Sequence, residues 1–220
     1  MRLSARARFM RVSRYLRAIL RGTRPMTRAC CLVPIAVALF FSASAHADAR
    51  LDVQHALERV VAAGGFHARV SGRVFGAALP PTSGEIDVVF PDKIHARTDV
   101  VDFIARPDGV WVNAFGVWAP VDRDAIPVTA FAPAEMRRAI ASIRDVHPAG
   151  SVMTAECQQN VYRFRATGQL PGAVANGDAR IWICERDGRP AKIEASSAAN
   201  GAVTVVFDWS RRPEVESPER

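Results

Sequence analysis

Short turns recur through most of this chain, and they separate stretches in which apolar and polar residues alternate. Tight turns are predicted at Pro91-Asp92, Pro107-Asp108-Gly109, Arg186-Asp187-Gly188 and Asn200-Gly201. The Asn-Gly pair is a strong hairpin signal, because both residues tolerate a positive φ. Neighbouring strands joined by turns this short must be antiparallel. The chain is therefore predicted to fold around an antiparallel sheet built from consecutive hairpins.

The alternating stretches predict about ten strands. They cover residues 66–75, 84–90, 93–98, 100–105, 110–121, 151–157, 161–167, 178–184, 190–198 and 203–209. The fifth stretch is expected to break near Gly116. A sheet with this many strands curls instead of staying flat. The polar tail after Trp209, residues 211–220, is expected to be frayed.

Two stretches have the period of an amphipathic helix. The first starts with Asp48 as its N-cap and stops at Gly64-Gly65, and its apolar face comprises Val53, Ala56, Leu57, Val60 and Val61. The second spans Pro133–Val146, with an apolar stripe of Met136, Ala139, Ile140 and Ile143. The predicted fold class is α+β: a strongly curved antiparallel sheet, an incomplete barrel of about 10–11 strands, with two or three helices covering its concave side.

The positive charge of the chain is confined to one end. The 220 residues have a formal net charge of +7, which by itself would suggest a nucleic-acid or membrane partner. Residues 1–47, however, contain nine arginines and no acidic residue, and residues 48–220 contain 20 basic and 22 acidic residues. The predicted folded part is nearly neutral, so no nucleic-acid partner is expected.

Residues 1–47 are predicted to be a leader and signal peptide. The uncharged stretch Cys30–Ala45 has 16 residues, fewer than the ~20 that a membrane-spanning helix needs. The following Ala45-His46-Ala47 fits the A-x-A cleavage pattern. Cleavage there leaves an exported single domain, residues 48–220. Met26 is predicted to be the true start, and a longer cationic leader is the alternative.

The cysteine pattern agrees with export. Cys157 and Cys184 are the only cysteines after the leader, and no CxxC motif is present. An even pair in an oxidising compartment predicts a disulfide. Two buried thiols are the alternative.

Known catalytic motifs are missing from the sequence. It contains no GxSxG, HExxH or Walker motif, and neither a cofactor nor a metal is expected. His67 and His95 are predicted to lie on the solvated side of their strands, and their combination with Asp87 has no metal-ligand spacing. Asp99 and Asp102 are the candidate pair for a carboxylate-dependent hydrolase, with loop or edge charges as the alternative interpretation.

The strands contain more apolar side chains than one buried face requires. In Val110-Trp111-Val112, for example, large apolar groups fall on both faces. Two interpretations stay open: a well-filled core, or a cavity between sheet and helices for an acyl chain or another lipophile. The residues predicted to line such a cavity are Phe66, Val88, Phe90, Val110, Val112, Phe207 and Trp209.

The order and spacing of several segments resemble the periplasmic lipoprotein-carrier family, LolA-like, of Gram-negative bacteria. The segments are the first strand after the helix, starting Phe66-His67-Ala68-Arg69; the strand, proline and returning strand of 84–97; the Asp-Gly turn and aromatic strand of 106–112; and Asp187-Gly188-Arg189-Pro190 with the final strand, 203–209. The similarity extends over nearly all of the predicted mature chain, and no single motif carries it alone.

The resemblance implies a half-barrel around an apolar cavity for lipoprotein acyl chains, in a periplasmic monomer with inner- and outer-membrane partner proteins. Relatives carry a basic residue before the proline of the second strand, where this chain has Phe90. The expected function is that of a carrier or binding protein for lipidated or lipophilic cargo, including sorting of lipoproteins to the outer membrane, without catalysis. The alternative is a sensor or interaction module of envelope stress signalling that binds a partner protein.

Overall fold

The computed structural model describes residues 33–74, 80–126, 128–197 and 201–218. It divides the chain into two units, Met1–Ser42 and Ala43–Arg220. The second unit contains every strand of the sheet. Leader residues 1–32 and Asn200 of a predicted hairpin lie outside the described residues.

The secondary structure of the described residues consists of α-helices, short 3-10 helices and strands. In chain order they are α1 (Val33–Ala62), β1 (Gly65–Gly72), β2 (Thr82–Val89), β3 (Lys93–Thr98), β4 (Asp102–Arg106), β5 (Gly109–Ala114), β6 (Val117–Val121), η2 (Arg123–Ala125), η3 (Val128–Phe131), α2 (Pro133–Ala141), β7 (Arg144–Met153), β8 (Gln158–Leu170), β9 (Ala173–Cys184), β10 (Pro190–Ser197) and β11 (Gly201–Phe207).

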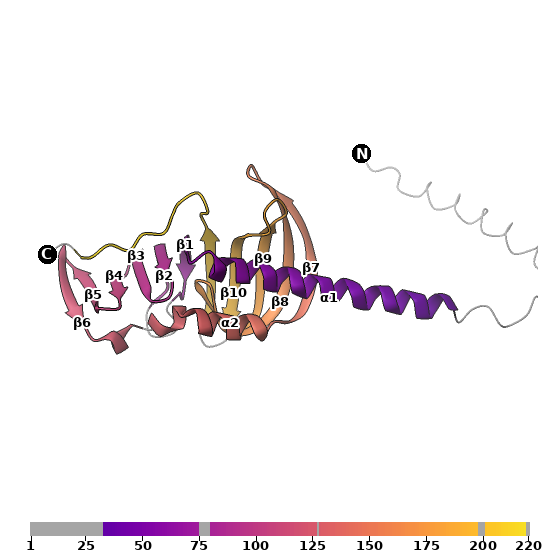
Figure 1. Ribbon diagram of the computed structural model, residues 1–220, viewed down its shortest axis with the longest axis horizontal. Coiled ribbons are helices and arrows are strands. Elements are labelled where there is room, and N and C mark those ends of the chain that lie inside the picture. The colour runs from indigo at the N-terminus through magenta and orange to yellow at the C-terminus, as the bar shows by residue number, and fades with distance from the viewer. Residues whose placement is uncertain (1–32, 75–79, 127, 198–200, 219–220) are drawn as a thin grey trace, which may run out of the picture. The chain divides into compact units, whose positions relative to one another are not determined.

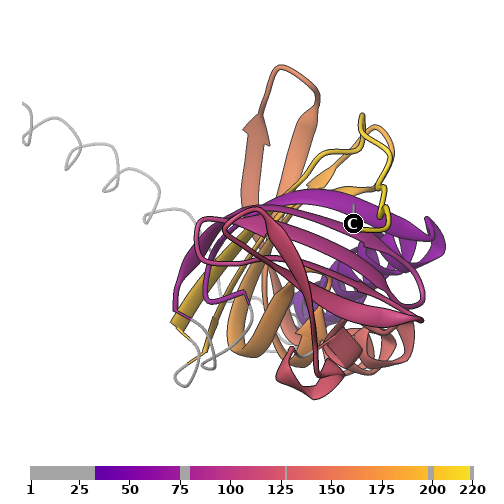
Figure 2. The ribbon, with the colours of Figure 1, turned by 90° about the vertical axis from the view of Figure 1, so that its left-hand side faces the viewer.

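The strands form one antiparallel sheet of eleven strands, in the order β6-β5-β4-β3-β2-β1-β11-β10-β9-β8-β7 (Figure 1). The first and last strands pair in its middle, with Ala68 opposite Phe207. Figure 2 looks from the β6 end and shows the strands curling around the helices. Because β6 and β7 do not pair with each other, the barrel is incomplete. The predicted α+β fold class is confirmed.

Helix α1 buries the face that its sequence predicts. Val53, Leu57 and Val60 are completely buried, and Ala56 and Val61 nearly so. Gly64 ends the helix with a φ of +76°, a conformation that glycine adopts without strain. The helix already begins at Val33, so the prediction of Asp48 as its N-cap is wrong. No glycine or proline interrupts residues 35–62, and nothing there stops the helix. In the described residues, no helix is long and apolar enough to cross a membrane.

Helix α2 is shorter than predicted. It ends at Ala141, and β7 begins at Arg144, so the prediction of a helix to Val146 is wrong. The Ser142 hydroxyl closes the helix and ties it to β8, because its Oγ accepts a bond from the Thr167 amide (2.9 Å) and lies 3.1 Å from the Thr167 carbonyl oxygen. Beyond that point the backbone pairs with β8, which outweighs the local helical period.

Strands β8 and β9 form a longer hairpin than predicted. Their turn contains Gly172 with a φ of +73°, and the pairing extends from Leu170–Ala173 to Gln159–Cys184. The predicted strand over 151–157 is wrong in part, because β7 stops at Met153 and β8 starts at Gln158. The expected break near Gly116 separates β5 from β6.

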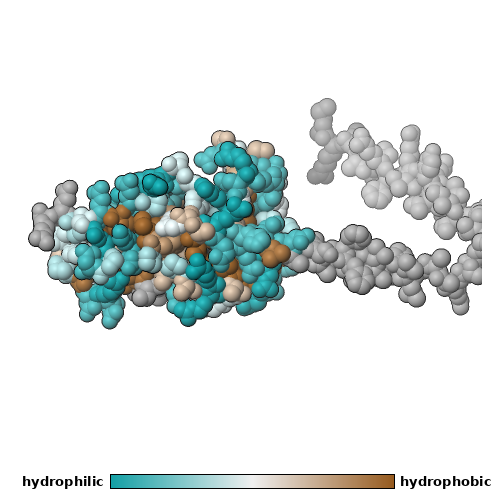
Figure 3. Space-filling view, viewed as in Figure 1, coloured by the Kyte–Doolittle hydropathy of each residue, from teal (hydrophilic) through white to brown (hydrophobic). Residues whose placement is uncertain are grey.

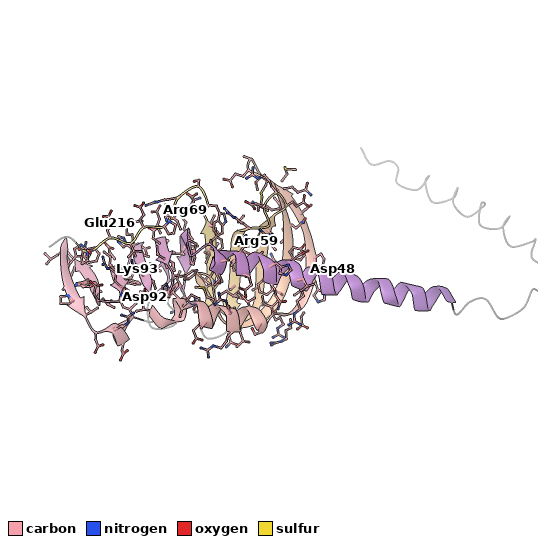
Figure 4. All side chains as sticks on the ribbon, in the orientation of Figure 1. Asp48, Arg59, Arg69, Asp92, Lys93 and Glu216 are labelled. Atoms are coloured by element: carbon pink, nitrogen blue, oxygen red, sulfur yellow. A yellow bond between two sulfur atoms is a disulfide. The ribbon has the colours of Figure 1, made fainter. Side chains whose placement is uncertain are left out.

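The C-terminal tail crosses the outer, convex face of the sheet (Figure 4, Glu216). Arg211 bonds Glu85 of β2 at 3.2 Å, and Ser217 accepts a bond from Arg106 of β4. These contacts tie the tail to the sheet as far as the described chain extends. The prediction of a frayed tail is therefore wrong for residues 211–218.

Candidate functional site

The residues predicted to line a cavity lie in, or pack against, the one apolar core of the described residues. Phe66 and Val88 are directly opposite each other on β1 and β2. Val110 and Val112 lie on the same face of β5, because side chains two positions apart point the same way. Phe207 ends β11 on the face that packs against the core. The structure thus gathers side chains from both ends of the sequence.

Four aromatic rings form a continuous row in this interior. The ring centroids of Phe90 and Phe66 are 6.2 Å apart, those of Phe66 and Phe207 are 5.4 Å apart, and those of Phe207 and Trp209 are 5.6 Å apart. Trp209 Nε1 donates a 2.7 Å hydrogen bond to the Pro190 carbonyl. The guanidinium of Arg189 lies 5.1 Å from the same ring. These contacts fix the orientation of the last ring in the row.

Burial divides the seven predicted residues into two groups. Phe66, Val88, Val110 and Phe207 are buried members of the core. Phe90, Val112 and Trp209 are only partly buried and pack against its margin. Figure 3 shows apolar side chains gathered on one face over the part of the sheet that contains β1–β5. We call Phe90, Val112 and Trp209 the apolar margin, because they are partly exposed and pack against the core.

The segment between β6 and α2 also contributes to the interior, which the sequence pattern did not predict. Ile126, Val128 and Phe131 are all buried in the same core cluster. Their spacing matches neither a strand nor a helix over enough residues to be recognised. The only sequence signal was a group of large apolar residues in an otherwise loop-like stretch.

Polar bonds connect the two helices with each other and with the sheet. Gln54 Nε2 of α1 donates to the Ile140 carbonyl of α2 at 3.2 Å. Tyr162 of β8 donates its hydroxyl to Asp52 of α1 at 2.9 Å. Burial, together with the bond to Asp52 and its negative charge, raises the pKa of Tyr162 to about 12. The tyrosine therefore stays a neutral donor at physiological pH.

The contact between Tyr162 and Asp52 predicts that Tyr162 ionises only at strongly alkaline pH. A Tyr15→Phe variant leaves Tyr162 as the only tyrosine, and its absorbance is expected to change with a midpoint near pH 12. In the unfolded chain the tyrosine ionises at a lower pH, about 10. The contribution of Tyr162 to stability is therefore complete below about pH 10 and is lost as the pH rises toward 12. Asp52→Asn should lower the midpoint. A midpoint near 10 in the folded protein would contradict the buried contact.

A polar cluster lies on the opposite, outer face of the sheet. His67 Nδ1 is 2.8 Å from Asp87 Oδ1, and Arg97 donates to Asp87 Oδ2 at 2.6 Å. His67 is only 3% exposed, so the prediction that it is solvated is wrong. A carboxylate that satisfies both a histidine and an arginine makes this burial tolerable. In the described part of the chain, no three His, Cys, Asp or Glu side chains could hold a metal ion.

The candidate carboxylate pair has separate structural partners. Asp99 accepts hydrogen bonds from the Ser83 amide (2.8 Å) and the Thr82 hydroxyl (2.7 Å), and these bonds lower the pKa of Asp99. Asp102 lies 3.2 Å from Nε2 of His95. Burial, followed by the charge of Arg97, lowers the pKa of His95. Each carboxylate therefore serves a turn or a strand contact.

Comparison with known proteins identifies the fold. No family model and no curated protein matches the sequence. Among solved structures, the lipoprotein LppX of Mycobacterium tuberculosis aligns with 77% of this chain and 98% of its own, at 12% identity and a TM-score of 0.52. LprF of Mycobacterium bovis aligns with 78% of this chain and 97% of its own, at 10% identity and a TM-score of 0.52.

A LolA superfamily protein, NE2245 of Nitrosomonas europaea, also matches, with 71% of this chain and 91% of its own aligned, at 11% identity and a TM-score of 0.29. For LppX and LprF, identities this low with TM-scores of 0.52 show a shared fold and nothing about ligands. The eleven-stranded open sheet wrapped around helices is the architecture that the sequence resemblance predicted. The chain shares the incomplete-barrel fold of LppX and LprF.

Proposed function

We propose that the protein is an exported carrier or binding protein for a lipophilic ligand, such as an acyl chain or a lipid-modified protein, and that it catalyses no reaction. The observation that carries this proposal is the apolar margin, Phe90, Val112 and Trp209, which is partly exposed and continuous with the buried interior. Each acyl methylene buried there would contribute about 0.8 kcal/mol. Sorting of lipoproteins to the outer membrane is one form that this function would take.

Ligand entry requires part of the cover to move. The helices cover the concave side of the sheet. The shortest covering segment is η3 with α2, which places Val128, Phe131 and Met136 in the core. This cover is a nine-residue helix and one 3-10 turn, far shorter than an autonomous helix. We therefore propose that this segment, more than α1, opens the interior and releases the ligand.

A charge in the apolar margin is predicted to abolish ligand binding. Val112→Glu would place a carboxylate without a partner beside an acyl chain, which should weaken binding by roughly 100-fold or more. Because Val112 is only partly buried, the variant should still fold. Binding is measured with a fluorescent fatty acid that an acyl lipid displaces.

The matched control is Val117→Glu on the neighbouring strand β6, where the valine is 68% exposed. It should bind like the wild type. Equal loss in both variants would show that general destabilisation, and not the apolar margin, explains the effect.

Export is part of the proposal and has its own test. If the signal peptide is removed after Ala47, mass analysis of the exported protein should find Asp48 as its first residue. This cleavage removes the N-terminal part of α1 and leaves the buried face from Val53 to Val61 intact. An exported protein that retains residues 30–45 would refute both the cleavage and the periplasmic location.

Exposed apolar side chains favour the alternative, an interaction module that binds a partner protein. Phe115 and Val117 at the β5–β6 hairpin, and Val152 and Met153 at the end of β7, are all exposed. They lie on the two edge strands or the turn beside one of them, where backbone groups are available for strand pairing. Such a module would purify with a stoichiometric amount of its partner protein and without bound lipid.

A further inference from the structure

The outer face of strands β7–β11 contains a cleft of about 610 Å³. It lies opposite the apolar interior, because its polar side chains alternate with buried residues such as Phe164 and Ala195. Its charged lining includes three arginines and three carboxylates: Arg163, Arg165, Arg180, Asp145, Asp178 and Glu194. The cleft thus combines charged side chains with an apolar lining, and it is separate from the apolar margin.

The carboxylates of the cleft already have basic partners. Asp178 lies 3.5 Å from Arg165 Nε within the cleft. Asp145 is 4.0 Å from Arg144, and Glu194 bonds Lys192. The acidic side chains are therefore neutralised by Arg165 and by two cations outside the lining, which leaves two arginines.

Arg163 and Arg180 are these remaining charges. They lie directly opposite each other on β8 and β9, and both are exposed. In the described part of the chain, neither forms an ion pair or a side-chain hydrogen bond. Two like charges directly opposite each other destabilise a sheet. Two guanidinium groups on one face also provide paired donors that match the oxygens of a phosphate.

One neighbouring hydroxyl adds to this donor set, beyond Glu194, whose carboxylate bonds Lys192. Across the sheet, Arg180 pairs in register with Glu194, and Glu194 with Thr204. Thr204 also lines the cleft and adds a hydroxyl to the row. The cleft therefore combines a defined volume, two unpaired cations and a neutral donor, which together suit a bound oxyanion.

We propose that this cleft binds a phosphate-type oxyanion through Arg163 and Arg180. The group is either a small phosphate or the phosphate of an anionic lipid headgroup. The site lies on the opposite face from the proposed lipophile site, so its occupancy does not depend on the proposed function.

The test measures phosphate binding to the full-length protein. Isothermal titration with sodium phosphate at low ionic strength should show binding, and Arg163→Gln and Arg180→Gln should each weaken it about tenfold. Arg163→Lys should lose part of the affinity, because it keeps the charge but not the paired donors. Arg69→Gln is the matched control: Arg69 is exposed on β1, outside the cleft (Figure 4), and the variant should bind like the wild type.

A second measurement distinguishes the two sources of the phosphate. Sedimentation with phosphatidylglycerol vesicles, compared with phosphatidylcholine vesicles, tests the lipid headgroup with the same variants. Binding of either phosphate or phosphatidylglycerol vesicles that depends on Arg163 and Arg180 supports the site. Absence of both, or an equal loss in Arg69→Gln, overturns it.

Discussion

The Phe66→Ala variant is expected to lose about 3–5 kcal/mol of the free energy of unfolding. Phe66 is 1% exposed, and its ring contacts Phe90 and Phe207 in the aromatic row. It lies on β1, the strand that pairs with both β2 and β11 in the middle of the sheet. Truncation therefore removes buried apolar area and leaves a cavity where the two halves of the chain meet.

Denaturant unfolding followed by tryptophan fluorescence and circular dichroism measures this loss. Phe115→Ala is the matched control, because Phe115 is fully exposed at the β5–β6 turn with a φ of +57°. Its removal should change stability by less than about 1 kcal/mol. If Phe66→Ala costs no more than Phe115→Ala, Phe66 does not lie in a packed interior.

Loss of the disulfide is expected to cost about 3.5 kcal/mol of the free energy of unfolding. Cys157 and Cys184 are bonded in the structure, with their Cα atoms 5.9 Å apart and 27 positions apart in the sequence. The bond closes the β8–β9 hairpin at its far end, where Gln159 pairs with Cys184. Most of the stabilisation comes from restricting the unfolded chain.

The measurement compares the wild type with a Cys157→Ser/Cys184→Ser variant, with and without a reducing agent. The reductant should lower the stability of the wild type to that of the variant and leave the variant unchanged. Thiol titration of the unfolded, unreduced protein cleaved before Asp48 should find no free thiol. Two free thiols in that protein would contradict the bond.

The antiparallel hairpins of the sheet were predictable from local signals, and the pairing of β1 with β11 was not. Asp-Gly turns and the alternation of apolar and polar residues identify hairpins directly. The buried face of α1 follows from the spacing of its apolar residues between Val53 and Val61. The end of α2 was not predictable in this way, because Val146 fits both a helical and an alternating pattern. Its conformation is decided by pairing between β7 and β8, which depends on residues far along the chain.

The candidate site was predictable only in part. Alternation placed Phe66, Val88, Val110, Val112 and Phe207 on one face, and in the structure they belong to the core or pack against it. Alternation did not show how deeply each residue lies, since burial depends on what covers the sheet. For the same reason it placed His67 in solvent, although His67 is buried against Asp87 of the neighbouring strand, which Arg97 of β3 also bonds.

Native mass spectrometry of the protein purified from the cells that produce it tests most directly whether the interior holds a lipophile. We predict additional mass that corresponds to an acyl lipid or a lipid-modified protein, present on the wild type and absent from Val112→Glu. A protein that carries no lipophile, or that purifies instead with a stoichiometric amount of an unlipidated protein, would contradict the carrier function and favour the interaction module.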